Sequence, residues 1–309
     1  MNGWTASDIP DQSGRTAVVT GANSGIGYVT ARELARRGAR VVLACRDATR
    51  GKAAEERLRA QAPGADVVFA PLDLADLSSV RAFAAELPGD RLDLLVNNAG
   101  VMALPQRKTV DGFEMQFGTN HLGHFALTGL LLPRLHEAGH GARVVTVSSG
   151  LHYLGTVDPR DLNMEHRYRR WTAYGRSKSA NLLFTHELAR RLTAAGSPVV
   201  AAAAHPGYAA TNLQTAGPRM EERAWAERLA ELSNRFAAQS PEHGALPSLY
   251  AATAPGVRQD DFYGPRFALW RGRPTLSPRA GWTRDDTASA GLWQASERLT
   301  GVAYSWPSA

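Results

Sequence analysis

The first two hundred residues alternate short apolar runs with longer helical patterns. The apolar runs are continuous rather than alternating, which is typical of parallel strands covered by helices on both faces. We predict strands at Thr16–Thr20, Arg40–Cys45, Val67–Ala70, Leu92–Asn97, Arg143–Ser148 and Pro198–Ala204. The intervening patterns predict helices at Gly27–Arg37, Gly51–Gln61, Ser78–Glu86, Phe113–Leu135 and Ala173–Ala194. Repeated βα units with right-handed crossovers predict an α/β fold, a three-layer doubly wound parallel sheet of the Rossmann type.

The alternation of predicted strands and helices ends after residue 207. Residues 212–240 carry a polar, Ala-rich helical pattern without an apolar strand before it. Because this insertion follows the end of a strand, it is placed to act as a lid over a site. One more strand is predicted near Tyr263–Leu269, and the tail from about residue 270 is rich in Gly, Pro, Trp and Arg. No linker divides the chain, so we expect residues 1–309 to form one domain.

Composition and charge exclude several classes of protein. A hydrophobic content of 44% with 21% charged residues is ordinary for a soluble globular chain. With Cys45 as the single cysteine, no intrachain disulfide can form, and we expect a reducing, cytoplasmic location. No apolar run approaches eighteen residues and the start of the chain is not basic, so neither a membrane anchor nor a signal peptide is expected.

The net charge of +6 comes mostly from arginines that are spread along helical stretches. One basic and aromatic patch, at residues 166–171 (HRYRRW), could bind a polyanion, but a solvated loop is the simpler interpretation. We therefore expect no nucleic-acid partner. The histidines His121, His124 and His205 are interpreted as packed or hydrogen-bonded, because no carboxylate or cysteine completes a metal set.

A glycine-rich loop follows the first predicted strand and begins the first helix. Glycines at positions 21, 25 and 27 give a G-x-x-x-G-x-G spacing, in which the missing side chains let the backbone approach a pyrophosphate at a helix N-terminus. A tight turn without a ligand is the alternative, and the strand–turn–helix context disfavours it. The residues predicted to bind a dinucleotide here are Gly21, Asn23, Ser24, Gly25, Ile26 and Gly27.

The end of the second strand indicates which dinucleotide binds. An acidic residue at that place would bind the adenosine ribose and repel a 2′-phosphate. Here the strand ends in Ala44-Cys45 and is followed by Arg46, whose guanidinium can bind a phosphate. This predicts NADP, although Asp47 is close enough that NAD use stays possible.

Two later segments fit the same pocket. Asp73 and Leu74 follow the third strand and can contact the adenine through a carboxylate and a backbone N–H. Asn98, Ala99 and Gly100 follow the fourth strand, where an amide side chain can brace the turn and the glycine lets the backbone pass a cofactor. Both segments are also common turn chemistry.

The sequence Tyr174-x-x-x-Lys178 places two titratable side chains on one face of a helix. Together with the glycine loop and Asn-Asn-Ala-Gly in this order, it makes residues 14–270 resemble the NAD(P)-dependent short-chain dehydrogenase/reductases. Residues 120–125 (NHLGHF) and the long spacing from Ser149 to Tyr174 resemble the retinol dehydrogenase, WW-domain oxidoreductase and protochlorophyllide reductase branch. The apolar anchor and WW domains of such proteins are missing, so a retinoid substrate is not carried over.

The resemblance implies a catalytic tetrad of Asn120, Ser149, Tyr174 and Lys178, with Ser148 as the alternative to Ser149. Tyr174 would be the general acid/base and Ser149 would stabilise the developing alkoxide. Lys178 and an oxidised nicotinamide would favour the phenolate, lowering the tyrosine pKa by about two to three units from its usual value of about 10.

The resemblance gives roles to three further features of the site. Asn120 would hold a water that links Lys178 to solvent. The turn at Pro206 and Gly207 would lie under the nicotinamide, and Thr211 would reach its carboxamide or the pyrophosphate.

We expect an NADP(H)-dependent oxidoreductase that interconverts a carbonyl and an alcohol on a small to medium apolar substrate. The resemblance also implies a homodimer or homotetramer that pairs through the helices of Phe113–Leu135 and Ala173–Ala194. One alternative is a dinucleotide-sensing protein without turnover. Others are a nucleotide-sugar epimerase or dehydratase, and a double-bond reductase of the protochlorophyllide reductase type.

Overall fold

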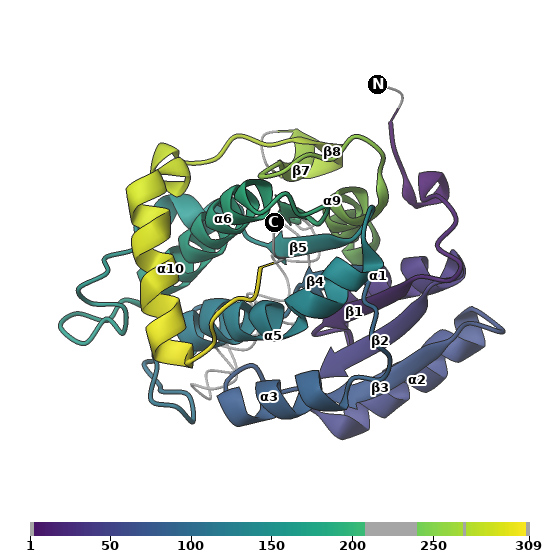
Figure 1. The fold of residues 1–309 in the computed structure, drawn as a ribbon, viewed down its shortest axis with the longest axis horizontal. Coiled ribbons are helices and arrows are strands. Elements are labelled where there is room, and N and C mark those ends of the chain that lie inside the picture. Colours follow the sequence, from purple (N-terminus) through teal and green to yellow (C-terminus); the bar gives the residue numbers. More distant parts are fainter. Residues whose placement is uncertain (1–2, 208–239, 268–269, 307–309) are drawn as a thin grey trace, which may run out of the picture.

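Eight strands of the described chain form a single sheet in the order β3-β2-β1-β4-β5-β6-β7-β8 (Figure 1). The structure is a computed structural model and describes residues 3–207, 240–267 and 270–306. The strands are β1 Thr16–Thr20, β2 Arg40–Cys45, β3 Val67–Pro71, β4 Leu94–Asn97, β5 Arg143–Val147, β6 Val200–Ala204, β7 Phe262–Phe267 and β8 Arg271–Leu276. All neighbours pair in parallel except β8, which is antiparallel to β7. The strand order reverses between β1 and β4, which confirms the predicted doubly wound sheet and locates its ligand crevice.

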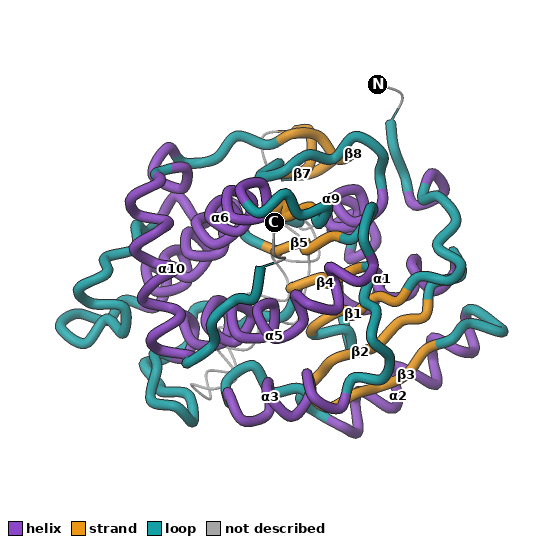
Figure 2. Tube along the Cα trace, in the orientation of Figure 1, coloured by secondary structure: helices purple, strands orange, loops and turns teal. Residues whose placement is uncertain are grey.

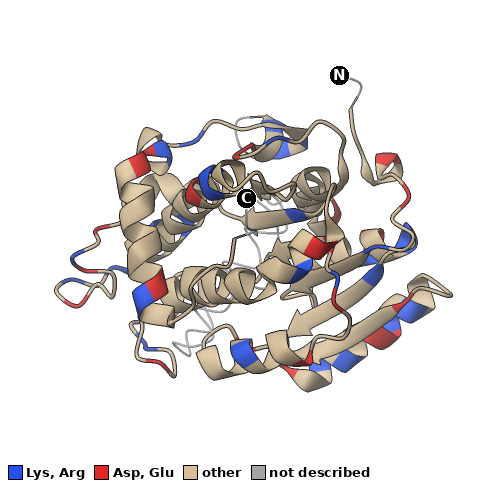
Figure 3. Cartoon of the chain, viewed as in Figure 1, with Lys and Arg blue, Asp and Glu red and all other residues tan. Residues whose placement is uncertain are grey.

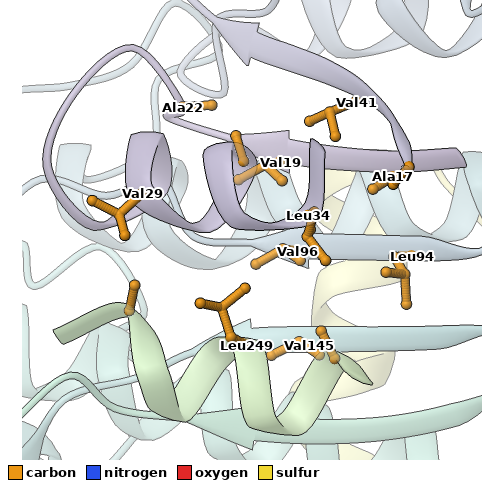
Figure 4. Packing of buried hydrophobic residues seen from close by; sticks show 14 of the residues in the cluster. Ala17, Val19, Ala22, Val29, Leu34, Val41, Leu94, Val96, Val145 and Leu249 are labelled. Atoms are coloured by element: carbon orange, nitrogen blue, oxygen red, sulfur yellow. The ribbon is translucent and has the colours of Figure 1, made fainter. Parts of the chain in front are cut away.

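Helices cover both faces of this sheet (Figure 2). One face carries α1 Gly25–Arg36, α2 Ala48–Gln61 and α9 Pro241–Thr253, and the other carries α3 Leu77–Glu86, α5 Gly123–Ala138 and α6 Arg170–Ala194. Alternate residues of one strand belong to the two layers. Val19 packs in the cluster that contains Leu34 of α1 (Figure 4), whereas Val18 packs in the cluster that contains Leu127 of α5. Each buried Val or Leu stabilises the fold by roughly 1.5–3 kcal/mol.

Hydrogen bonds from two aspartate carboxylates explain where two of the predicted boundaries were wrong. Helix α2 begins three residues earlier than predicted, because the Asp47 carboxylate accepts a hydrogen bond from the N–H of Arg50 at 3.0 Å. Strand β4 begins two residues late, because the Asp93 carboxylate at its entrance accepts the N–H of Thr16 at 2.9 Å.

The helix predicted at Phe113–Leu135 is interrupted. A short helix, α4 (Met115–Phe117), leads into a π-helical turn at Gly118–Leu122, and α5 follows. In the π-turn the N–H of Gly123 bonds to the carbonyl of Gly118, five residues earlier. Turns of this kind are frequent at functional sites, and this one contains Asn120.

The C-terminal part contains two elements that the sequence did not predict, β8 and α10 (Asp286–Thr300). Helix α10 lies across α5 and α6 (Figure 1). Its Trp293 is 2% exposed, packs edge-on to Phe125 at a ring separation of 5.0 Å and stacks on Phe184 at 5.9 Å. After the helix, the Tyr304 hydroxyl donates to the carbonyl of Phe125 at 2.7 Å. Helix α10 and the segment after it therefore cover the part of α5 and α6 around Phe125 and Phe184, on the helices that the resemblance assigns to subunit pairing.

Charged side chains of both signs are mixed along the outer helices (Figure 3). Within the described ranges no helix is long and apolar enough to cross a membrane. The same residues contain no group of three histidine, cysteine or acidic side chains that could hold a metal ion. The predicted lid at 212–240 lies outside the described residues apart from its last position.

Candidate active site

The glycine loop has the geometry of a phosphate-binding turn. Gly21 and Gly25 have φ angles of +66° and +56°, which side chains rarely adopt. A Cβ on Gly27 would lie 2.5 Å from the carbonyl oxygen of Gly21, so the chain can pass there only as glycine. Ser24 makes no capping bond from its side chain to the first turn of α1. The N–H groups at this helix N-terminus are thus oriented to bind an anion.

Thr20, at the end of β1, connects this loop to the end of β4. Its hydroxyl oxygen accepts the N–H groups of Asn98 and Ala99, both at 2.9 Å. It also lies 2.9 Å from Nε2 of His124. Because Nδ1 of His124 donates to the carbonyl of Asn120 at 3.0 Å, Nε2 must accept the Thr20 proton. This network fixes the turn at 98–100, and sequence reasoning gave neither Thr20 nor His124 a part in it.

The adenosine end of the cavity carries two arginines. Arg46 and Arg50 have side chains that are 70% and 72% exposed. Their nearest carboxylates are Asp73, 3.9 Å from Nε of Arg46, and Asp47, 3.6 Å from Nε of Arg50. Arg50 was missed from the sequence, although its place one turn after Arg46 at a helix start was a usable signal.

Asn120 braces the loop after β4 from the π-turn. Its Oδ1 accepts the N–H of Val101 at 2.8 Å, and its Nδ2 donates to the carbonyl of Val101 and to the Ser177 hydroxyl, both at 2.9 Å. Both polar atoms of the side chain therefore bond to protein atoms. The resemblance implied a water held by Asn120, for which the backbone carbonyl, which already accepts from His124, and the second lone pair of Oδ1 are the groups left.

The structure brings Ser149 and Tyr174 together. Ser149 follows β5 by two residues and caps a short 3₁₀ turn, where its Oγ accepts the N–H of Leu151 at 3.1 Å. Its side chain lies close enough to the Tyr174 hydroxyl to oppose, in part, the rise in the pKa of that group. The alternative, Ser148, also lines the cavity, and its buried hydroxyl donates to the carbonyl of Lys178 at 2.8 Å. Tyr174 itself is 6% exposed.

Burial sets the protonation of Tyr174 and Lys178. It raises the pKa of Tyr174 to about 12, against a smaller opposite effect of the Ser149 hydrogen bond. Burial also lowers the pKa of Lys178 to about 8. The lysine Nζ donates to the carbonyl of Val147 at 3.0 Å and lies 5.7 Å from the Tyr174 ring centre. The predicted lowering of the tyrosine pKa, which also needs the positive charge of an oxidised nicotinamide, stays a prediction for the complex with the cofactor.

These parts surround one cavity of about 370 Å³. The predicted site residues that line it are Gly21, Asn23, Ser24, Gly25, Ile26, Gly27, Arg46, Asp73, Leu74, Asn98, Ala99, Gly100, Tyr174, Lys178 and Pro206. Gly207 follows directly, with its N–H bonded to Nδ1 of His205 at 3.2 Å. Asn120 and Ser149 contact residues at the edge of the cavity. Thr211 lies outside the described residues.

Comparison with known proteins identifies the family. A family model described as short chain dehydrogenase matches residues 15–222. The chain belongs to the short-chain dehydrogenase family. It is 44% identical to mouse polyprenol dehydrogenase over 95% of this chain and 86% of the relative. It is 43% identical to human retinol dehydrogenase 12 over 94% and 88% of the two chains. These relatives place it in the retinol dehydrogenase-like branch and among oxidoreductases acting on CH–OH groups.

Solved structures show the same fold. A putative uncharacterised protein from Mycobacterium paratuberculosis is 48% identical, with a TM-score of 0.81 over 98% of this chain and 100% of the other. The Pseudomonas aeruginosa RhlG/NADP active-site complex is 27% identical, with a TM-score of 0.62 over 82% and 94% of the two chains.

Proposed function

We propose that the protein is an NADP(H)-dependent oxidoreductase that interconverts a carbonyl and an alcohol, with Tyr174 as the general acid/base. One observation carries this proposal: Tyr174, with Ser149 next to its hydroxyl, lines a cavity whose other end is a phosphate-binding loop. Lys178 lies one helical turn later and lines the same cavity. This arrangement suits proton transfer to an oxygen next to a bound dinucleotide.

Each end of the cavity is suited to a different part of a dinucleotide. Gly27, which has no room for a Cβ, and the N-terminus of α1 would hold the pyrophosphate. The turn at 98–100 and Pro206 would line the nicotinamide end. NADPH, when bound, supplies the hydride, while the protein supplies position and charge.

The preference for NADP is supported at the adenosine end. The Asp47 carboxylate also lines the cavity, but one of its oxygens is engaged by the N–H of Arg50 at the start of α2. Arg46 and Arg50 both line the cavity with largely exposed guanidinium groups. A charge-assisted hydrogen bond to a phosphate contributes about 1.5–3 kcal/mol, so Arg46→Ala or Arg50→Ala should weaken NADPH binding by roughly tenfold or more. NADH binding should change little, and equal losses for both dinucleotides would contradict the assignment.

The raised pKa of Tyr174 suits the reductive direction. At neutral pH its phenol carries a proton, which it gives to the carbonyl oxygen of the substrate and takes back in oxidation. The Ser149 hydroxyl donates to the same oxygen and stabilises its developing charge. Because Leu151 donates its N–H to Ser149 Oγ, one lone pair of that oxygen is engaged by the turn itself. Lys178, with its pKa lowered to about 8, is close to the point where it can exchange a proton at neutral pH.

The substrate we propose is a small to medium apolar carbonyl or alcohol. Two relatives with over 40% identity are named for retinol and polyprenol, which are apolar alcohols. Aliphatic aldehydes of increasing chain length, with retinal among them, form the test panel.

The acid/base role is tested by Tyr174→Phe. This variant should lose turnover by at least about 100-fold while binding NADPH as tightly as the wild type, because only the transferable proton is removed. Tyr28→Phe is the matched control, since the Tyr28 hydroxyl bonds to Gln61 at the end of α2 and Tyr28 does not line the cavity. Turnover retained in Tyr174→Phe, or no NADPH oxidation across the panel, would refute the proposal.

A further inference from the structure

Two buried histidines lie behind the catalytic turns and have no part in the reaction proposed above. His152 is in the turn that follows Ser149, and His205 directly follows β6. Both are 0% exposed. Both rings contact Phe262 of β7, with ring centres 5.9 Å and 5.1 Å away.

The partners of His152 determine which nitrogen carries its proton. Nδ1 lies 2.7 Å from the carbonyl oxygen of Ser149, and Nε2 lies 3.1 Å from the backbone nitrogen of Ala280. A carbonyl can only accept and a backbone N–H can only donate, so Nδ1 is protonated and Nε2 accepts. The ring is neutral, and burial together with nearby Arg279 lowers its pKa despite the favourable bond to Ser149.

His205 has the opposite tautomer. The N–H of Gly207 donates to Nδ1 at 3.2 Å, so the proton is on Nε2, which donates to the Ser277 hydroxyl at 2.9 Å. Burial lowers the pKa of this ring to about 3. A Cβ on Gly264 of β7 would lie 1.9 Å from Nε2, so a glycine at that position makes room for the ring.

Both histidines therefore bind the same short segment after β8, which we call the strap, Ser277–Ala280. The strap is itself fixed at several points. The N–H of Ser277 donates to the carbonyl of Phe262 at 2.7 Å. Arg279, whose side chain is fully buried, makes two bonds to the Asp260 carboxylate, one of them at 2.8 Å. The strap lies outside residues 15–222, the part matched by the family model.

We propose that the strap positions the two turns of the active site, with His152 and His205 as the positioning residues that connect it to Ser149 and Gly207. This inference rests on the proposed function. The Ser149 carbonyl accepts both the ring and the backbone N–H of His152, at 2.7 Å and 3.0 Å, which fixes the peptide that carries the reacting hydroxyl. Gly207 belongs to the turn at the nicotinamide end of the cavity. The connections thus predict separate effects, on turnover through His152 and on cofactor binding through His205.

Two variants of His152 each keep one of its bonds. In His152→Asn the amide nitrogen can replace Nδ1 and donate to Ser149, whereas in His152→Gln the amide oxygen can replace Nε2 and accept from Ala280. Because positioning needs both ends, each variant should lower kcat by about tenfold to 100-fold without a change in NADPH affinity. His136→Asn, on the outer part of α5, is the matched control and should retain kcat.

Ser277→Ala tests the other connection. It removes the acceptor of the His205 proton and should weaken NADPH binding several-fold while kcat at saturating cofactor changes less. Folded His152 variants with unchanged kcat, or a Ser277→Ala variant with unchanged NADPH affinity, would overturn the proposal.

The tautomers provide a test that does not depend on activity. In protein labelled with ¹⁵N at histidine, the NMR spectrum at pH 7 should show His152 protonated at Nδ1 and His205 protonated at Nε2, assigned by the loss of signals in the variants. The opposite tautomer or a charged ring at either residue would contradict the proposed role of the strap. If the wild type reduces no carbonyl while both tautomers are as expected, the proposed function has failed and the strap's connections stand.

Discussion

Replacing Thr20 by Val is the sharpest test of how the active-site turns are held. The side chain keeps its shape and loses only a hydroxyl, and Thr20 is 0% exposed. That hydroxyl accepts the N–H groups of Asn98 and Ala99 and donates to His124, which is 1% exposed. The buried histidine nitrogen left unpaired should cost about 1–3 kcal/mol. The two N–H groups border the cavity, where water can replace the hydroxyl, so each should cost only about 0.5–1 kcal/mol.

The expected loss in the free energy of unfolding is therefore about 2–5 kcal/mol, measured by urea denaturation followed by circular dichroism. Thr30→Val is the matched control, because Thr30 is equally buried and its hydroxyl has no hydrogen-bond partner among the described residues. That variant should be neutral or slightly stabilised. NADPH affinity should fall in Thr20→Val alone, since Asn98 and Ala99 line the cavity. A loss below about 0.5 kcal/mol in Thr20→Val would refute the reasoning, since it is less than one net hydrogen bond.

Three further predictions concern acid, the glycine loop and the C-terminal helix. Burial lowers the pKa values of His121, His124 and His205 to about 3, 4 and 3, below the unfolded value of about 6.5. The unfolded state therefore binds more protons, and the free energy of unfolding should fall as pH drops below about 6.5, by up to about 1.4 kcal/mol per pH unit for each histidine. Urea midpoints that stay constant from pH 7 to pH 5 would contradict this. Gly27→Ala should abolish NADPH binding in calorimetry, because its Cβ would meet backbone at 2.5 Å, and an unchanged affinity would show that the loop does not bind the cofactor. Trp293→Ala should cost about 3–5 kcal/mol in urea denaturation, and a cost below about 1 kcal/mol would show that α10 packs loosely.

The sheet and the outline of the site were predictable because they depend on local patterns. Continuous apolar runs give β1 to β6, and glycines at fixed spacing after a strand give the phosphate loop. Tyr174 and Lys178 lie on one helix face for the same reason, since four residues make about one turn. The chain order of these motifs was enough to place them around a common cavity.

The remaining features depend on contacts between residues far apart in the chain. The π-turn at Asn120 is held by bonds to Val101, and no periodicity of the surrounding helix signals it. The sequence shows the charged neighbour of Tyr174 but not the extent of its burial, which raises its pKa in the protein without a cofactor. The partner of His152 is 128 residues away, so only the folded chain shows which of its nitrogens donates.

Because α10 belongs to the same chain, the covering of the face that it packs on does not depend on protein concentration. An aromatic contact such as that of Trp293 with Phe125 and Phe184 resembles the centre of an interface, but here both sides belong to one chain. Association between subunits gains strength by mass action, whereas a contact within a chain has the same strength at any dilution. The α5 and α6 face should therefore stay covered in dilute solution, and release of α10 would convert it into an exposed apolar surface prone to self-association.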